Sequence, residues 1–99
     1  MRTTAVQLDS MLTSTPGVCG GRLRIEGTRV TVLQIVTLYK RGESPEEIAQ
    51  NFPQLMLSHV YAALAYYHAN QAEVERELAD ELAEFDRLKH QHPSPTGQP

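Results

Sequence analysis

A strict alternation of polar and apolar residues runs through residues 20–32, and no other feature of the chain limits its fold as strongly. Successive side chains of an extended strand point to opposite faces, so a period of two indicates a half-buried ribbon. The apolar positions that would share one face are Leu23, Ile25, Val30 and Val32, and the polar positions on the other face are Arg22, Arg24 and Thr31. We therefore predict a β-hairpin with a basic outer face.

The dipeptide at residues 27–28 is predicted to form the turn of this hairpin. Glycine at its first position is typical of a two-residue type II′ loop. Such a loop sets Ile25 opposite Val30 as an apolar pair, and Glu26 opposite Arg29 as a charge pair. The register of the hairpin is thereby predicted residue by residue.

Three helices are predicted after the hairpin. Thr31 and Gln34 form a capping-box pattern, and the helix that follows ends at Gly42. Ser44, followed by proline and two glutamates, predicts a second, short helix. Apolar residues at spacings of three and four then predict one helix over about residues 58–89, about 48 Å long at 1.5 Å per residue. Such a helix is too long for so small a body, so its end should extend beyond the domain.

The expected fold class is α+β, mostly α, with an N-terminal β-hairpin, a three-helix unit similar to a helix-turn-helix and a long C-terminal helix. A short strand is also predicted near residues 11–13. We divide the chain into a hairpin and helix-turn-helix-like domain at residues 1–72, an extension of the last helix at residues 73–89, and a tail at residues 90–99. The tail is rich in proline and polar residues and is expected to be disordered.

The composition excludes several classes of protein. A chain of 99 residues has room for one small core and little for a catalytic cleft, so we expect no enzymatic activity. Cys19 is the only cysteine, no run approaches the roughly 20 apolar residues of a membrane span, and no signal-peptide pattern is present, so a cytoplasmic location is expected. The four histidines lack zinc-site spacing and the Gly20-Gly21 pair lacks a following lysine, so neither a metal nor a cofactor is expected.

Charge is distributed unevenly between two parts of the chain. Residues 1–42 contain six basic and two acidic side chains, whereas residues 43–99 contain three basic and ten acidic ones. Opposite charge on two regions favours two surfaces for two kinds of partner. The alternative, that these are ordinary solvated charges, stays open.

Five short motifs occur between residues 12 and 74. They are PGVCGGR (16–22), IEGTRV (25–30), GESPEEI (42–48), FPQL (52–55) and VYAALAYY (60–67). In this order they resemble the domain-of-unknown-function 433 family. The resemblance implies a small, mostly helical, DNA-binding-like bacterial domain, of a kind often regarded as the antitoxin of a type II pair encoded beside a small PIN-like nuclease toxin. Two positions depart from the family pattern: Leu23 replaces a usual proline, and Met56 replaces a capping threonine, for which Ser58 is a substitute two residues later.

DNA contact is predicted through the hairpin rather than through the helix-turn-helix-like unit. Residues 43–75 contain five acidic side chains and no lysine or arginine, which opposes approach to a polyanion. The candidate DNA-binding residues are Arg22, Arg24, Arg29, Lys40 and Arg41, acting in a dimer that doubles the charge. The alternative is that Arg29 pairs with Glu26, while Lys40 and Arg41 only complement the negative end of the first helix.

The last helix provides a candidate partner-binding surface. Its apolar residues, Val74, Leu78, Leu82, Phe85 and Leu88, span roughly 120° of the circumference, with acidic residues around the rest. An apolar stripe of this kind, on a helix that extends past its domain, is expected to be buried against another protein surface. A toxin could take it in the helix-in-groove mode. The alternatives are a helix folded back on its own domain and a homodimeric coiled coil.

Together with the resemblance to the family, which implies the antitoxin role and the PIN-like toxin, these observations predict a protein that binds and neutralises such a nuclease toxin, forms homo-oligomers and binds its own promoter DNA as a dimer. A stand-alone DNA-binding transcriptional regulator and a homomeric interaction module without DNA binding are the alternatives. No membrane partner is expected.

Overall fold

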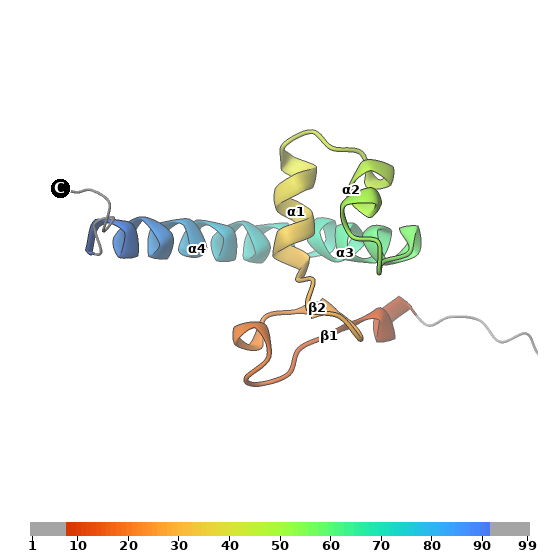
Figure 1. The fold of residues 1–99 in the computed structure, drawn as a ribbon, viewed down its shortest axis with the longest axis horizontal. Helices are drawn as coiled ribbons and strands as arrows, with labels where there is room; N and C mark the ends of the chain where they lie inside the picture. Colours follow the sequence, from red (N-terminus) through yellow and green to blue (C-terminus); the bar gives the residue numbers. More distant parts are fainter. Residues whose placement is uncertain (1–7, 92–99) are drawn as a thin grey trace, which may run out of the picture.

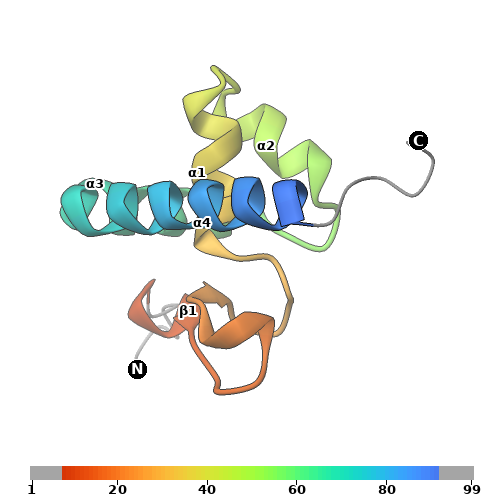
Figure 2. The ribbon, with the colours of Figure 1, turned by 90° about the vertical axis from the view of Figure 1, so that its left-hand side faces the viewer.

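A computed structural model gives the fold and describes residues 8–91. The elements are η1 (Leu8–Met11, a 3-10 helix), β1 (Leu12–Thr13), η2 (Cys19–Gly21, 3-10), β2 (Arg24–Ile25), α1 (Val32–Lys40), α2 (Pro45–Asn51), α3 (Leu57–Ala69) and α4 (Gln71–Gln91). The β segment lies on one side of the layer formed by α3 and α4, and α2 lies on the other side (Figures 1 and 2). The predicted α+β, mostly α class is confirmed. Most of the predicted tail lies outside the described residues.

The two named strands form an antiparallel pair. Leu12 lies opposite Ile25 and Thr13 opposite Arg24. The backbone N–H of Glu26 donates to the carbonyl oxygen of Met11 at 2.8 Å and extends this contact by one residue. The short strand predicted near residues 11–13 is therefore present, and it covers one edge of β2.

The other edge of β2 carries the predicted hairpin register but not the predicted turn. The N–H of Ile25 donates to the carbonyl oxygen of Val30 at 2.8 Å, and Arg24 forms a bridge with Thr31, as the register requires. The hydroxyl of Thr28 accepts from the N–H of Val30 and donates to the carbonyl oxygen of Ile25, each at 3.0 Å. This side chain therefore takes the place of a backbone bond of the ladder.

The prediction of a two-residue II′ loop is wrong. The N–H of Thr28 donates to the carbonyl oxygen of Ile25 at 3.0 Å, so Gly27, with φ of 82°, is the third residue of a four-residue turn. A positive φ at that position is the requirement of a type II turn. The second arm stays a single bridge because Thr31 leaves it to cap α1.

The first two helices begin where their capping patterns predict. The hydroxyl of Thr31 accepts from the N–H of Gln34, and the amide oxygen of Gln34 accepts from the N–H of Thr31. Ser44 and Glu47 form the same reciprocal pair at the start of α2. Each pair satisfies backbone donors that the helix itself leaves unbonded.

The start of α3 differs from the proposed substitution of Ser58 for the missing threonine. Met56 is the N-cap, and its N–H donates to Nδ1 of His59 at 2.9 Å. The imidazole thus accepts the hydrogen bond that a glutamate or glutamine side chain accepts in a capping box. As a result α3 begins at Leu57, without a shift in its starting position.

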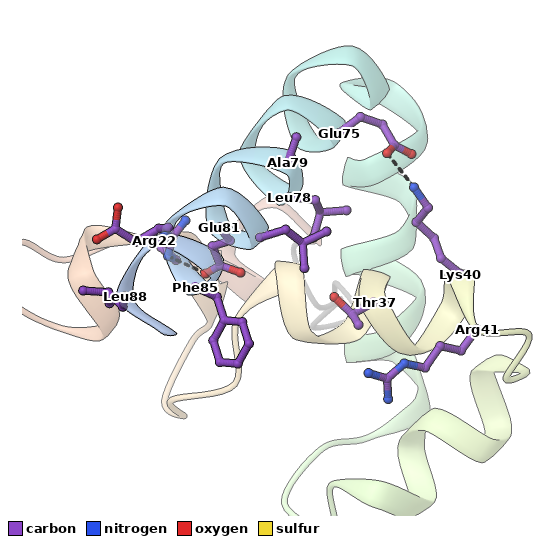
Figure 3. Close-up of a pocket in the computed structure, with 12 residues that line it drawn as sticks. Arg22, Thr37, Lys40, Arg41, Glu75, Leu78, Ala79, Glu81, Phe85 and Leu88 are labelled. Atoms are coloured by element: carbon purple, nitrogen blue, oxygen red, sulfur yellow. Dashed lines mark hydrogen bonds and ion pairs between the residues drawn. The ribbon is translucent and has the colours of Figure 1, made fainter. Parts of the chain in front are cut away.

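The predicted single C-terminal helix is two helices. Asn70 separates α3 from α4 with φ of −133° and ψ of 42°, and its side-chain amide donates to the carbonyl oxygen of Tyr66 at 3.1 Å. Asparagine side chains compete for backbone groups in this way and so interrupt helices. The two helices consequently diverge from the turn beside Glu75 (Figure 3), and α4 contacts both α1 and α3.

The core lies where the ribbon, α1, α2, α3 and the start of α4 meet. The side chains that are essentially inaccessible are Ile25, Val32, Ile35, Val36, Ile48, Val60 and Val74. Of these, Val32, Ile35 and Val36 lie in the first turn and a half of α1, and Ile25 lies in the strand before it. The helix α1 is therefore buried around much of its circumference, as predicted. In the described part of the chain no helix combines the length and apolar character that a membrane crossing needs.

Candidate partner-binding site

An open groove lies between α4 and α1 (Figure 3). Its volume is about 840 Å³, and its apolar lining comes from α4. The apolar residues are Leu78, Leu82, Phe85 and Leu88, with Ala79 beside them. Thr37 of α1 and Arg41, the C-cap residue of α1, line the facing wall. The groove therefore combines an apolar floor with charged residues of both signs, which are Arg22, Lys40, Arg41, Glu75, Glu81 and Glu84.

The predicted partner-binding stripe is divided between the core and this groove. Val74 is fully buried in the core of its own domain, and Leu78 packs against that core. Further along, Leu82 is 69% exposed, Phe85 62% and Leu88 43%. Val74 is thus unavailable to a partner, because the break at residue 70 directs the start of α4 against α1 and α3. The remaining surface is the outer half of α4, which extends past the body of the domain (Figure 1).

A polar cluster fastens the inner half of α4. Oε1 of Glu75 lies 2.5 Å from Nζ of Lys40 on α1, and Oε2 accepts a hydrogen bond of 2.5 Å from the hydroxyl of Tyr67 on α3. The bond from Lys40, followed by that from Tyr67, lowers the pKa of the Glu75 carboxyl. The same contact with Glu75 raises the pKa of the Lys40 amine and of the Tyr67 phenol. One carboxylate therefore ties three helices together.

A second ion pair links α4 to the ribbon. Nε of Arg22 lies 2.9 Å from Oε2 of Glu81, and both side chains are about two-fifths exposed, at 39% and 42%. Arg22 was predicted to lie on a DNA-facing surface, but here it contacts α4 (Figure 3). This ion pair marks the end of the part of α4 that contacts the rest of the domain.

The five predicted DNA-binding residues lie on two separate surfaces. Arg22, Lys40 and Arg41 line the groove beside α4. Arg24 and Arg29 instead line a second hollow, of about 600 Å³, beside the turn of the ribbon. The ribbon therefore does not present all of these residues on one continuous basic face.

The side chains of Arg24 and Arg29, the two arginines at the second hollow, differ in their hydrogen bonds. Arg24 donates from Nη1 to the carbonyl oxygen of Thr28 at 3.2 Å and from Nη2 to the hydroxyl of Thr15 at 2.9 Å. Its Nε is buried and has no hydrogen-bond partner in the described part of the chain. Arg29 is exposed, and within residues 8–91 it forms no ion pair with Glu26, so the alternative pairing of these two residues is absent. Arg29 is the accessible cation of this hollow.

The helix-turn-helix-like unit formed by α2 and α3 presents an apolar outer surface. Met56 is 65% exposed, Leu57 38% and Tyr61 50%, all around the start of α3. The absence of lysine and arginine from residues 43–75 leaves this surface without phosphate-binding side chains. That DNA contact avoids these helices therefore stays a prediction.

Sequence reasoning did not identify Thr37 of α1 or Ala79 of α4. Both line the groove without any local pattern that distinguishes them from other helix residues. The available signal was the pairing of opposite charges on the two regions, which Arg22–Glu81 and Lys40–Glu75 realise within one chain. Across the described residues no group of three or more histidine, cysteine, aspartate or glutamate side chains is placed to hold a metal ion.

Comparison with known proteins agrees with the motif order. A family model described as "Protein of unknown function (DUF433)" matches residues 12–67, so it ends within α3 and does not include α4. The crystal structure of a DUF433 member protein from Anabaena variabilis ATCC 29413 is 38% identical in sequence, with a TM-score of 0.66 over 73% of this chain and 71% of that chain. No curated protein matches the chain. On the strength of the family model and the shared fold, this chain belongs to the DUF433 family of proteins of unknown function.

Proposed function

We propose that this protein is antitoxin-like and neutralises a small PIN-like nuclease toxin by binding it through the outer half of α4. The proposal assigns binding, and no catalysis, to the residues of the groove. The observation that carries it is the exposure of Leu82, Phe85 and Leu88 on one face of α4, beside an open groove. The antitoxin role itself is what the resemblance to the family implies.

The energetics of this surface favour a bound partner. Full burial of each large apolar side chain is worth roughly 1.5–3 kcal/mol, and three such side chains are clustered here. A contiguous apolar patch beside polar residues is typical of an interaction site. An amphipathic helix that lays its apolar face into a partner's groove is an established mode of recognition. The outer half of α4 has the features that this mode requires.

The charge of α4 favours a basic partner surface. From residue 71 to 91 the helix contains seven acidic and three basic side chains, of which residues 71–81 carry five acidic and one basic, and residues 82–91 carry two of each. Complementary charge around an apolar contact accelerates association and selects the partner. A nuclease that binds a polyanionic substrate needs basic residues, so the acidic part of α4, at residues 71–81, is suited to lie beside its substrate-binding surface.

Co-expression with a PIN-like nuclease encoded beside this chain tests the proposal. We expect the two proteins to co-purify and the nuclease to be inactive on RNA in the complex. The Leu82→Asp/Phe85→Asp double variant should lose the nuclease, because it places two charges in the apolar contact. Ala83→Asp, an exposed change about 160° away around the helix from Phe85 by the helical period, is the matched control and should retain it.

The proposal fails if the wild-type chain leaves the nuclease active and unbound. It also fails if the double variant and Ala83→Asp capture the nuclease equally well. Circular dichroism of both variants establishes that a difference in capture is not a difference in folding.

Promoter DNA binding as a dimer is a second candidate, supported by the hollow beside the ribbon turn. Arg29 and Arg24 line this hollow together with Gln54, which lies in the connection between α2 and α3. Arginine supplies phosphate affinity, and glutamine can contact base edges. The ribbon and the helix-turn-helix-like unit are therefore adjacent at this point.

Arg29→Ala is the substitution that tests this candidate, because Arg22 and Arg24 also hold the fold through contacts of their own. We expect weaker DNA binding in a gel-shift titration and a salt slope lower by about one for each protomer. Arg76→Ala, an exposed change on α4, is the control. Equal affinity and equal salt slope for the two variants would exclude DNA contact at this hollow.

A further inference from the structure

The connection between α3 and α4 is a single residue. Asn70 alone separates the two helices, and its φ of −133° and ψ of 42° turn the chain there. Its N–H still donates to the carbonyl oxygen of Tyr66 at 2.9 Å, and its carbonyl oxygen accepts from the N–H of Val74 at 3.0 Å, as in a continuous α-helix. A change of conformation at this one residue would therefore join α3 and α4 into one helix over residues 57–91.

The turn leaves backbone groups apart that a continuous helix would pair. In an α-helix each N–H donates to the carbonyl oxygen four residues earlier. Among residues 8–91, the N–H groups of residues 71–73 form no such bond with the carbonyl oxygens of residues 67–69. A chain that is straight at Asn70 gains these three bonds, and each intramolecular bond of this kind contributes to stability.

The local sequence favours the straight form, with the exception of Asn70 itself. Residues 68–72 contain no glycine or proline, and alanine, the strongest helix former, is present on each side of the turn at residues 69 and 72. The apolar spacing also continues through the turn, from Val60 and Leu64 to Leu78. The side-chain amide of Asn70, which donates to the carbonyl oxygen of Tyr66, favours the bend. The remaining support for the bend comes from contacts of α4 with other elements.

The side chains that fasten α4 reach across to other elements of the fold. The contacts are those of Val74 with the core, of Glu75 with Lys40 and Tyr67, and of Glu81 with Arg22. These are contacts between side chains, so none of them requires that α4 belong to the same copy of the chain. The α4 helix of a second copy carries the same residues and fits the same site.

We propose that two copies of this chain exchange their α4 helices by straightening at Asn70. In the dimer α3 and α4 of each chain form one continuous helix, and each body is completed by Val74, Glu75 and Glu81 of the other copy. Exchange of an identical element is a low-cost route to a dimer, because the contacts already exist in the monomer. Every contact between α4 and the body is kept, and each chain gains the backbone bonds of residues 71–73.

The exchange is a property of the inner half of α4. The entropy lost when two copies associate opposes it, so the balance between the bent monomer and the exchanged dimer depends on protein concentration. The outer half of α4 keeps the surroundings that it has in the monomer. The inference is thus independent of toxin binding and stands or falls separately from the proposed function.

Substitution of Asn70 tests the hinge, with sedimentation velocity of the full chain over a range of concentrations as the measurement. We expect the wild-type chain to dimerise as its concentration rises. Asn70→Ala should dimerise about tenfold or more tightly than Asn70→Gly, because alanine favours the continuous helix and glycine does not, once in each copy. The two variants are matched, since both lose the side-chain bond to Tyr66.

Charge reversal shows whether α4 is exchanged. Lys40→Glu and Glu75→Lys each place like charges together within their own chain. In an exchanged dimer of one copy of each variant, the acid introduced at position 40 meets the base introduced at position 75, and the other body keeps the native pair. We expect a mixture with one variant labelled with nitrogen-15 to form more heterodimer than random pairing gives, as measured by native mass spectrometry. Labelled and unlabelled wild-type chains, which should pair at random, are the control.

Three results would overturn the inference. They are a wild-type chain that is monomeric at every concentration, equal dimerisation of Asn70→Ala and Asn70→Gly, and random pairing of the charge variants. Random pairing would mean that each copy keeps its own α4 and that the dimer forms through another surface. Arg22→Glu and Glu81→Arg provide a second pair at a partly exposed position, so the test stays decisive if a change at Glu75 impairs folding.

Discussion

The inner and outer halves of α4 have the same apolar periodicity but different surroundings. In the inner half Val74 is fully buried, and Glu75 joins α4 to α1 and α3. In the outer half Leu82 and Phe85 lie on the same face but are more than three-fifths exposed. The pattern of apolar residues predicts which face of a helix will be buried. It does not predict whether that face is buried by the same chain or by another molecule.

The difference between the halves assigns them different roles. The inner half stabilises the domain, and the outer half is available for a partner. The ion pair between Arg22 and Glu81 lies at the boundary between them. Substitutions on either side of this boundary should therefore affect different measurements.

The largest expected difference is between a charge placed in the inner half of α4 and a charge placed in the outer half. Val74→Asp should lower the free energy of unfolding by about 4 kcal/mol or more, because an unpaired carboxylate would be buried. Leu82→Asp should change it by no more than about 0.5 kcal/mol, since that side chain is exposed in the monomer. Urea denaturation at low protein concentration, followed by circular dichroism, makes the comparison. Similar losses in both variants would contradict the division of α4.

Truncation is the next test. Removing residues 73–99 should cost about 3 kcal/mol, because Val74 and part of Leu78 leave the core together with the Glu75 contacts. Removing only residues 82–99 should leave the melting temperature nearly unchanged while abolishing toxin capture. If the shorter deletion is also strongly destabilising, the outer half contributes to the stability of the monomer.

Glu75→Gln should have a smaller effect that depends on pH. The pKa of Glu75 is lowered in the folded protein, so its contribution is complete above the ordinary carboxyl pKa and is lost as pH falls through the lowered value. The pKa of Lys40 is raised, so its contribution is lost as pH rises through the raised value. Near neutral pH the variant should melt at a lower temperature than the wild type, and this difference should vanish in acid. A difference that persists in strong acid would show that the charge of Glu75 is not its cause.

The smallest effect is expected from Arg22→Ala. Its ion pair with Glu81 is about two-fifths exposed, and pairs of this kind contribute about 0.2–1 kcal/mol. The loss should decrease as salt is added. Arg76→Ala, which changes the same charge on the exposed surface of α4, is the control for general effects of charge. Equal unfolding free energies for the two variants would show that the boundary pair does not stabilise the inner half.

The local structure of the chain was largely predictable because it depends on neighbouring residues. Thr31 and Ser44 cap α1 and α2 as their patterns predict, since each capping bond spans only three residues. The hairpin register was predicted correctly from the apolar alternation. The turn was not, because the hydroxyl of Thr28 takes over a backbone bond, and the pattern of apolar residues contains no information about that choice.

The candidate site was predictable only in part. Leu82, Phe85 and Leu88 were identified from their spacing, and they line the groove. Arg22 and Lys40 were predicted to contact DNA, but they pair with acidic residues of α4. These pairs join residues 59 and 35 positions apart in the chain, so they depend on the path of every element between them.

The sequence by itself determined where α1 and α2 begin, which face of α4 is apolar, and membership in the DUF433 family. These properties follow from hydrogen bonds and periodicities within a few residues, and from motifs in a constant order. Only the tertiary structure decided that Asn70 divides the last helix, that Val74 belongs to the core, and that the basic residues separate onto two surfaces. The physical reason is that burial and ion pairing depend on which elements meet in space, and the turn at residue 70 sets that meeting for α4.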